Sequence, residues 1–361
     1  KKSDFIRWRF FYMITFIVAV VTVMSGMSSN PHSNTAETLV AITKSNNLGK
    51  EDIIVLGYVT SWSKELPNPF LVTHLSYAFA TIDNDFKSLT IKNEPRFKEI
   101  VNLKKVNPKL KVTLSIGGWG ASNFSEMADT ETSRAAFIAN AMKIVREHNL
   151  DGLDIDWEYP GSTLGVISSS KNDKSNFTEL MKQLRDSLGD SRLLSFASPS
   201  YSVYFNYKDV APYVDFVNVM TYDISVPPRH HSPLNHSNLT GKSCVKDVIA
   251  EHFIKGVPAD KIVLGIPFYG RGNEKSYKKF QDYRYIRPKD GTELRFDSVA
   301  MAPYIADKET GELLISFDDT TSVKAKCKFV KETGIRGVMI WHYCGDTKEH
   351  ELLNTINSEL Y

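Results

Sequence analysis

Cysteine is scarce in this sequence, which contains three residues of that type among 361 (Cys244, Cys327 and Cys344). Three cysteines are too few for a disulfide scaffold, and their spacing matches no common metal site. One disulfide and one free thiol would fit this number, and the spacing does not select the pair. We therefore expect no bound metal and a fold that depends on an apolar core.

The sequence also lacks an excess of charge of either sign. Its 44 Lys and Arg residues nearly balance 42 Asp and Glu residues, the formal net charge is +2, and no basic block occurs. Without a basic patch, we expect no nucleic acid partner. No internal repeat and no low-complexity tract is present, which excludes a solenoid. The composition, 42% hydrophobic, is that of a globular chain long enough for one large core or two smaller ones.

One long hydrophobic run lies near the start of the chain, over residues 10–24, and four basic residues precede it. With the small residues that follow, it approaches the roughly 17–20 residues that cross a bilayer. The basic flank predicts a cytoplasmic N-terminus. We therefore interpret residues 1–27 as a signal anchor, or as a signal peptide cleaved near Ser25 or Gly26. We favour the anchor because the run is long. This predicts a single-pass membrane protein whose main domain is extracellular or lumenal, and a secreted protein is the alternative.

Two further features accompany this segment. Residues 28–50 are polar without clear periodicity, which predicts a stalk or linker before a main domain at 51–361. Four Asn-x-Ser/Thr triplets agree with entry into the secretory pathway. They begin at Asn123, Asn176, Asn235 and Asn238.

After residue 50, short apolar runs alternate with helix-like segments. The predicted strands are Ile53–Thr60, His74–Ala80, Lys111–Ile116, Gly152–Glu158, Leu193–Ala197, Phe216–Met220, Ile262–Pro267 and Gly337–Trp341. The predicted helices are Arg96–Val106, Thr132–His148, Lys174–Leu188, Cys244–Lys255, Ser322–Thr333 and Glu349–Leu360, with a shorter one within Asn206–Val214. Eight such strands predict an α/β fold, a closed (β/α)₈ barrel. An open doubly wound sheet is the alternative, although no glycine-rich phosphate loop follows the first strand.

One connection, from Pro267 to Gly337, is longer than a single helix requires. Its part over 271–316 is rich in polar and aromatic residues. We expect a short insertion there, between the seventh strand and the seventh helix, on the rim of the barrel.

The segment 151–160 carries three apolar residues that alternate with Asp154, Asp156 and Glu158. This period of two predicts a strand with one apolar face and one face of three carboxyls. Same-face neighbours on a strand lie roughly 6.5–7 Å apart, and like charges that close raise one another's pKa. On a buried strand this pattern indicates proton chemistry. Asp151 falls off the period, and we interpret it as a structural residue that contacts backbone at the start of the strand.

Nearly every predicted strand ends on an aromatic residue. These residues are Tyr58, Trp62, Phe79, Trp119, Tyr159, Tyr222, Tyr269 and Trp341. In a (β/α)₈ barrel these ends meet on one face, where active sites lie. Rings around carboxyls suit a sugar-binding cleft, because flat sugar faces stack on rings and hydroxyls bind to acids.

The pattern Asp151-x-x-Asp154-x-Asp156-x-Glu158 resembles the signature of glycoside hydrolase family 18, the chitinases and chitinase-like proteins. Other motifs of that family are matched in order on the third, sixth, seventh and eighth strands. They are Ser115-Ile-Gly-Gly118, Met220-Thr-Tyr-Asp223, Tyr269-Gly-Arg271 and Trp341. The resemblance covers about residues 53–360.

The resemblance implies hydrolysis of β-1,4 bonds next to N-acetylglucosamine, with retention of configuration and with the substrate's acetamido oxygen as the nucleophile. It implies that Glu158 is the general acid and base. It implies that Asp156 orients the acetamido group and stabilises the oxazolinium intermediate, and that Asp154 shares a proton with Asp156. Tyr222 would donate a hydrogen bond to the acetamido oxygen.

The same resemblance assigns the sugar contacts and the wall of the cleft. These residues are Tyr58, Trp62, Phe79, Trp119, Met220, Asp223, Tyr269, Arg271, Met339 and Trp341. Ser115 is expected to hydrogen-bond near Asp154, and Gly117 and Gly118 to let the chain turn close to the acidic strand. We interpret His230, His231 and His236 as a solvated loop without a metal.

We favour an active chitinase, because the acidic motif is intact. A chitin-binding lectin without turnover is the alternative, and a hydrolase of N-linked glycans or bacterial wall shares the same acids. We expect chitin or an N-acetylglucosamine oligosaccharide as the partner, no cofactor, and a monomer.

Overall fold

The computed structural model describes residues 31–45, 49 and 53–361, with no side chains described at 31–34 and 44–45. The predicted signal anchor or signal peptide lies outside the described residues. Among the helices that the structure describes, none is both long and apolar enough to cross a membrane.

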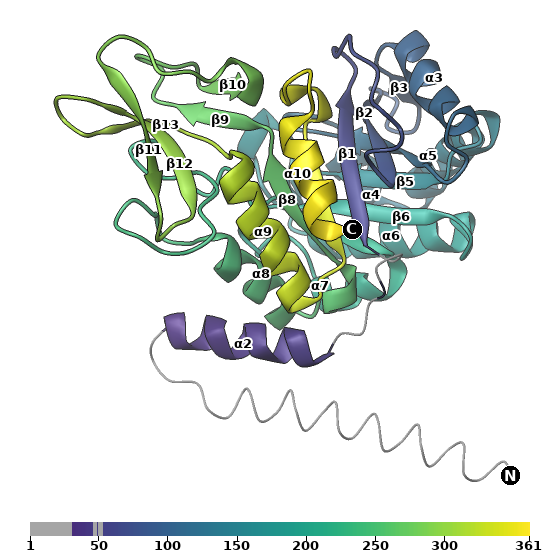
Figure 1. Ribbon diagram of the computed structural model, residues 1–361. Coiled ribbons are helices and arrows are strands. Elements are labelled where there is room, and N and C mark those ends of the chain that lie inside the picture. Colours follow the sequence, from purple (N-terminus) through teal and green to yellow (C-terminus); the bar gives the residue numbers. More distant parts are fainter. Residues whose placement is uncertain (1–30, 46–48, 50–52) are drawn as a thin grey trace, which may run out of the picture.

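Eight parallel strands close into a barrel (Figure 1). They are β1 (Ile54–Thr60), β2 (His74–Ile82), β4 (Lys111–Gly117), β5 (Gly152–Asp156), β6 (Leu193–Ser198), β7 (Phe216–Val219), β8 (Ile262–Pro267) and β14 (Gly337–Trp341). β1 pairs with both β14 and β2, which closes the sheet. The predicted (β/α)₈ barrel is confirmed, and the open sheet is wrong. A short strand, β3 (Leu89–Ile91), pairs antiparallel with the end of β2.

Helices cover the outside of the barrel. They are α3 (Glu94–Asn102), α4 (Phe124–Asp129), α5 (Glu131–Glu147), α6 (Asp173–Leu188), α7 (Tyr207–Val210), α8 (Val245–Ile254), α9 (Thr320–Thr333) and α10 (Glu351–Leu360). On β5, Leu153 and Ile155 join the large apolar core between strands and helices, as does Trp157 just beyond its end. Since side chains alternate across a strand, Asp154 and Asp156 point to the barrel interior. The predicted division of this segment into an apolar and an acidic face is therefore confirmed.

The segment after β8 forms a second, antiparallel sheet on the rim, which we call the rim sheet. Its strands are β9 (Tyr269–Gly272), β10 (Phe280–Asp282), β11 (Thr292–Asp297), β12 (Ala302–Asp307) and β13 (Leu313–Ser316), in the order β10-β9-β13-β12-β11. The insertion was predicted from its length, whereas its strands were not, because they are short.

The prediction of a polar linker over residues 28–50 is wrong for its middle part. Residues 31–45 form helix α2 (Pro31–Ser45), which lies against α8 and α9 (Figure 1). Ile42 is fully buried and joins the main core, and Thr35 Oγ1 donates a hydrogen bond to Asp247 Oδ1 (2.9 Å). So few apolar residues contact the barrel that no periodic pattern appears in the sequence.

All three cysteines are buried and unpaired, so the disulfide that their number would permit is not present. A buried ion pair joins α9 to the segment just before it, and a hydrogen bond joins α9 to Ser232, much earlier in the chain. Lys326 Nζ of α9 donates to Asp318 Oδ2 (2.5 Å) and to Ser232 Oγ (2.6 Å), and both charged side chains are shielded from water. Burial lowers the pKa of Lys326, which the charge of Asp318 opposes.

We expect Lys326→Ala to lower the free energy of unfolding by about 3–5 kcal/mol, because it leaves the buried Asp318 charge without its partner. Urea denaturation would measure the loss. Lys328→Ala is the matched control, since Lys328 is exposed on the same helix. The Lys326→Met, Asp318→Leu double variant should recover most of the stability. Equal stability of the Lys326→Ala and Lys328→Ala variants would contradict this account.

Candidate active site

Asp154, Asp156 and Glu158, which we call the acidic row, lie at the centre of the barrel. A glycine at the end of β4 lets that strand approach β5 closely. Asp154 is completely buried, Asp156 is buried, and Glu158 is partly exposed beyond the end of β5. A Cβ at Gly117 would lie 2.1 Å from the Asp156 carbonyl oxygen, and Gly117 has a φ of +125°. Gly118 donates its backbone N–H to the same oxygen (2.9 Å). The predicted close turn beside the acidic strand is therefore confirmed.

Asp154 is held by hydrogen bonds on both carboxylate oxygens. Ser115 and Ser195 stand opposite Asp154 on the two neighbouring strands, so their side chains share its face. Their hydroxyls donate to Oδ2 and Oδ1 respectively, each at 2.7 Å. Tyr58 donates to Oδ2 (2.9 Å) and Asn218 to Oδ1 (3.1 Å). Burial raises the pKa of Asp154, and these hydrogen bonds oppose that rise.

The hydrogen bonds on Asp154 bear on the proton that it was expected to share with Asp156. All four hydrogen bonds to Asp154 come from other residues, and no Asp154–Asp156 hydrogen bond occurs in the described part of the chain. Burial and the charges of Glu158 and Asp154 raise the pKa of Asp156 well above its ordinary range. Its Oδ1 is buried without a hydrogen-bond partner among the described residues. Asp156 Oδ1 is therefore a buried acceptor that no described residue satisfies.

Glu158 is suited to hold a proton near neutral pH. Its pKa is raised to about 7, because burial and the charge of Asp223 together outweigh the hydrogen bond that Tyr159 donates to Oε2 (2.9 Å). A carboxylic acid with a pKa near the working pH can both donate and accept a proton.

Asp223 lies on the other side of the site, after β7, with a φ of +53°. Burial opposes its ionisation, but His231, Arg271 and Tyr269 together lower its pKa below the ordinary value. Arg271 Nη1 lies 3.4 Å from Oδ2, and the guanidinium stacks over Phe280 (4.3 Å).

Tyr222 and Met339 lie at the bottom of the site. The Tyr222 hydroxyl contacts Met339 Sδ (3.7 Å), and its ring packs edge-on against Tyr269 (5.9 Å). Burial raises the pKa of Tyr222, so its hydroxyl stays protonated and can donate a hydrogen bond. Met339 is fully buried, and Met220 packs at the edge of the same interior cluster.

Trp341 forms an aromatic floor with two neighbours. Phe79 stacks on it (5.6 Å, 23°), and Tyr58 packs at a tilt (5.6 Å). Trp62 and Trp119 are 63% and 64% exposed, so their faces are open to a ligand. All fourteen site residues predicted from the sequence thus belong to, or follow, the strands whose ends meet at this face of the barrel.

The contacts of three other side chains of the site were not predicted from the sequence. Ser195 and Asn218 bind Asp154, and Tyr159 binds Glu158. The first two had a signal, since each is a polar residue between apolar neighbours on a predicted strand. Asp151 accepts a hydrogen bond from the Val112 backbone (2.8 Å), as its structural role predicted.

The prediction of a solvated histidine loop is wrong for His230 and His231, which are fully buried between the barrel and the rim sheet. His230 contacts Ser316 (3.1 Å) and Asp297 (3.4 Å). The rim sheet folds over this loop and removes both imidazoles from water. The local sequence around the histidines could not predict this burial, because the covering residues lie much later in the chain.

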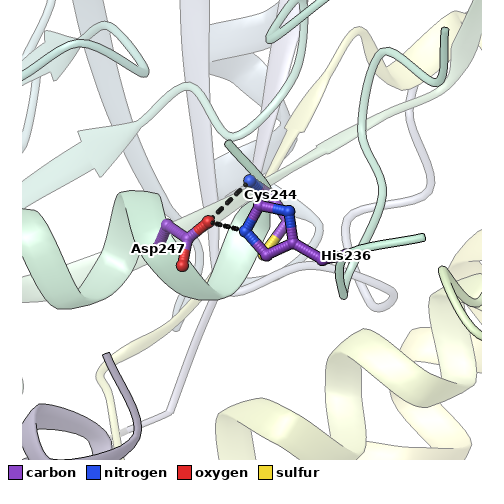
Figure 2. Close-up of side chains that lie close together, drawn as sticks. All are labelled: His236, Cys244 and Asp247. Carbon is purple, nitrogen blue, oxygen red and sulfur yellow. Dashed lines mark hydrogen bonds and ion pairs between the residues drawn. The ribbon is translucent and has the colours of Figure 1, made fainter. Parts of the chain in front are cut away.

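His236, Cys244 and Asp247 are the described residues whose metal-ligating atoms lie together, within 4.8 Å (Figure 2). Asp247 pairs with His236 and accepts the Cys244 backbone N–H (3.1 Å) and the Thr35 hydroxyl. Burial and the charge of Asp247 raise the pKa of the Cys244 thiol to about 12. The carboxylate already has several donors, so we assign this cluster to capping α8 and holding α2.

Comparisons with known proteins agree with this geometry. The family profile described as glycosyl hydrolases family 18 matches residues 54–346. Chitinase A1 of Niallia circulans is 31% identical over 82% of this chain and 48% of its own length. Chitotriosidase-1 of Mus musculus is 31% identical over 79% of this chain and 71% of its own. The chain thus spans about half of the first relative and over two thirds of the second.

A solved structure of a family 18 protein is also similar to this chain. A family 18 N-acetylglucosaminidase from Paenibacillus barengoltzii superposes with a TM-score of 0.77 at 31% identity. The superposition covers 85% of this chain and 99% of that one. The barrel and the rim sheet described above therefore occur within a known group of sugar-cleaving proteins.

Proposed function

Because this chain belongs to family 18 of the glycosyl hydrolases, we propose that it hydrolyses β-1,4 bonds of N-acetylglucosamine polymers by a retaining, substrate-assisted mechanism. The observation that supports this most is Glu158, whose pKa is raised to about 7 beside the buried Asp156 and Asp154. A single acid at this position can serve as both proton donor and proton acceptor.

In the first step, Glu158 gives its proton to the glycosidic oxygen as the bond to the leaving sugar breaks. The acetamido oxygen of the retained sugar forms a bond to the anomeric carbon, and the resulting oxazolinium carries the positive charge. Asp156 accepts the acetamido N–H and stabilises that charge, while the Tyr222 hydroxyl binds the acetamido oxygen.

In the second step, Glu158 takes a proton from water as that water attacks the anomeric carbon on the face the leaving sugar has vacated. The bond between the anomeric carbon and the acetamido oxygen breaks, which restores the acetamido group. Two inversions give net retention. Trp341 lies under the reacting sugar, and the exposed Trp62 and Trp119 stack on sugars farther along the polymer.

The alternative is a lectin that binds chitin without cleaving it. Incubation of the purified protein with a labelled N-acetylglucosamine oligosaccharide distinguishes the two. Release of shorter labelled products supports the enzyme. Saturable binding of intact oligosaccharide without products would support the lectin. A panel with N-linked glycan and peptidoglycan fragments tests the remaining substrates.

The raised pKa of Glu158 gives a pH prediction. The reaction requires protonated Glu158, so we expect kcat/KM to fall as the pH rises through about 7. The negative charge of Asp223 contributes to the raised pKa, and Asp223→Asn should lower it. The alkaline limb of the profile should then move to lower pH by about 0.5–1 unit. Asp190→Asn, at an exposed position outside the site, is the control. An unmoved limb in Asp223→Asn would contradict this assignment.

We also propose that residues 1–27 anchor the protein in a membrane with the barrel outside the cytoplasm. The basic flank and apolar run support this. N-terminal sequencing of the mature protein separates an intact anchor from a cleaved signal peptide. If N-glycans are added, Asn238 is the expected site, because it is exposed, whereas the amides of Asn123 and Asn235 donate to backbone carbonyls.

A further inference from the structure

His231 lies at the junction of three segments that build one wall of the site. Its backbone carbonyl accepts from Ile224 N (3.0 Å), just after Asp223. Its backbone N–H donates to Ser316 Oγ of the rim sheet (3.3 Å). The ring packs against that of Tyr269 (5.4 Å). These contacts fix the imidazole in place, with no exposure to water.

The ring faces Asp223. Nδ1 lies 3.5 Å from Asp223 Oδ1, beyond the length of a well-formed hydrogen bond. Neither ring nitrogen has a shorter polar contact with the described residues. Asp223 is therefore the acceptor available to Nδ1, and hydrogen bonds of this kind often tighten when substrate binds.

The Asp223 carboxylate is held from both sides. His231 stands at Oδ1 (3.5 Å) and Arg271 at Oδ2 (3.4 Å), while Tyr269 also lowers the pKa of Asp223. Asp223 has a φ of +53°, in the left-handed region that Asp adopts more readily than most residues with a side chain. The neighbouring His230 contacts Asp297 (3.4 Å) and Ser316 (3.1 Å).

We propose that His231 is a positioning residue, which holds the Asp223 carboxylate as an anion beside Glu158. Its effect on catalysis rests on the proposed function, whereas its effect on Asp223 does not. His231 does not touch the reacting atoms. It acts through Asp223, whose charge keeps the proton on Glu158.

Two substitutions separate this role from simple filling of space. The amide nitrogen of Asn can occupy the place of imidazole Nδ1, so His231→Asn keeps a donor toward Asp223. Leu fills the space without a donor. If His231 only packs, both variants should behave alike, or Leu should be the better of the two.

The first experiment measures Asp223 directly, by carbon NMR titration of aspartate carboxyls in the full chain, with Asp223→Asn to assign the signal. In His231→Leu the pKa of Asp223 should rise by about one unit, since a charge-assisted donor is lost. In His231→Asn it should rise less. An unchanged Asp223 pKa in His231→Leu overturns the inference, whatever the activity of the protein.

The second experiment measures kcat/KM on an N-acetylglucosamine oligosaccharide across pH. His231→Leu should move the acid limb to higher pH and lower the rate by about tenfold, and His231→Asn should retain most of the wild-type rate. In an Asp223→Asn background, His231→Leu should cause no further loss. An equal loss in both backgrounds overturns the inference. Absence of turnover in the wild type would instead overturn the proposed function, and the titration would still decide the role of His231.

Discussion

Glu158→Gln should lower turnover of an N-acetylglucosamine oligosaccharide by about 10³-fold, because an amide cannot transfer the proton that the leaving oxygen needs. Glutamine has almost the same shape as glutamic acid and still accepts the hydrogen bond from Tyr159. The sugar contacts of Trp341, Trp62 and Trp119 are untouched. We therefore expect the dissociation constant for the oligosaccharide to change by only a few-fold.

Initial rates and calorimetric titration measure the two quantities on the same preparations. Glu147→Gln is the matched control, because Glu147 is an exposed residue at the end of α5. It should leave both quantities unchanged. Full activity in Glu158→Gln would remove Glu158 from the mechanism.

Asp156→Asn should lower kcat by about 10²–10³-fold, the usual effect of removing one group that stabilises charge in the transition state. An asparagine can still accept the acetamido N–H through its oxygen. It has no negative charge with which to stabilise the oxazolinium. The loss should therefore appear mainly in kcat, with a smaller change in KM.

The stability of the same variant should move in the opposite direction. The pKa of Asp156 is raised on folding, and such a carboxyl destabilises the native state above its unfolded pKa, increasingly as the pH rises. Asp156→Asn removes this cost, so its melting temperature at neutral pH should equal or exceed that of the wild type. Loss of both activity and stability would indicate that Asp156 is mainly structural.

The barrel and the acidic row could be predicted from the sequence because both depend on short periods. The eight strands are apolar runs separated by amphipathic helices, and Asp154, Asp156 and Glu158 alternate with apolar residues. The direction of the strands then brings their ends to one face. The hydrogen bond of Asp151 to backbone followed from the same pattern, whereas that of Ser115 to Asp154 followed from the family resemblance.

What could not be predicted depends on contacts between distant segments. His231 precedes the rim-sheet residues that bury it, and its ring faces a carboxylate eight positions back in a loop without periodicity. Helix α2 contacts the barrel through few apolar residues, so its polar composition indicated a linker. Apart from that of Ser115, the hydrogen bonds on Asp154 come from β1, β6 and β7, whose donors lie far from it in the sequence.

The most direct measurement is proton NMR of the sugar released during the first minutes of hydrolysis of an N-acetylglucosamine oligosaccharide. A substrate-assisted mechanism with Glu158 as the acid and base predicts the β-anomer first, followed by slow mutarotation. An oligosaccharide with a free amino group in place of the acetamido group at the cleavage point should not be cut. The α-anomer as the first product, or cleavage without the acetamido group, would contradict the mechanism.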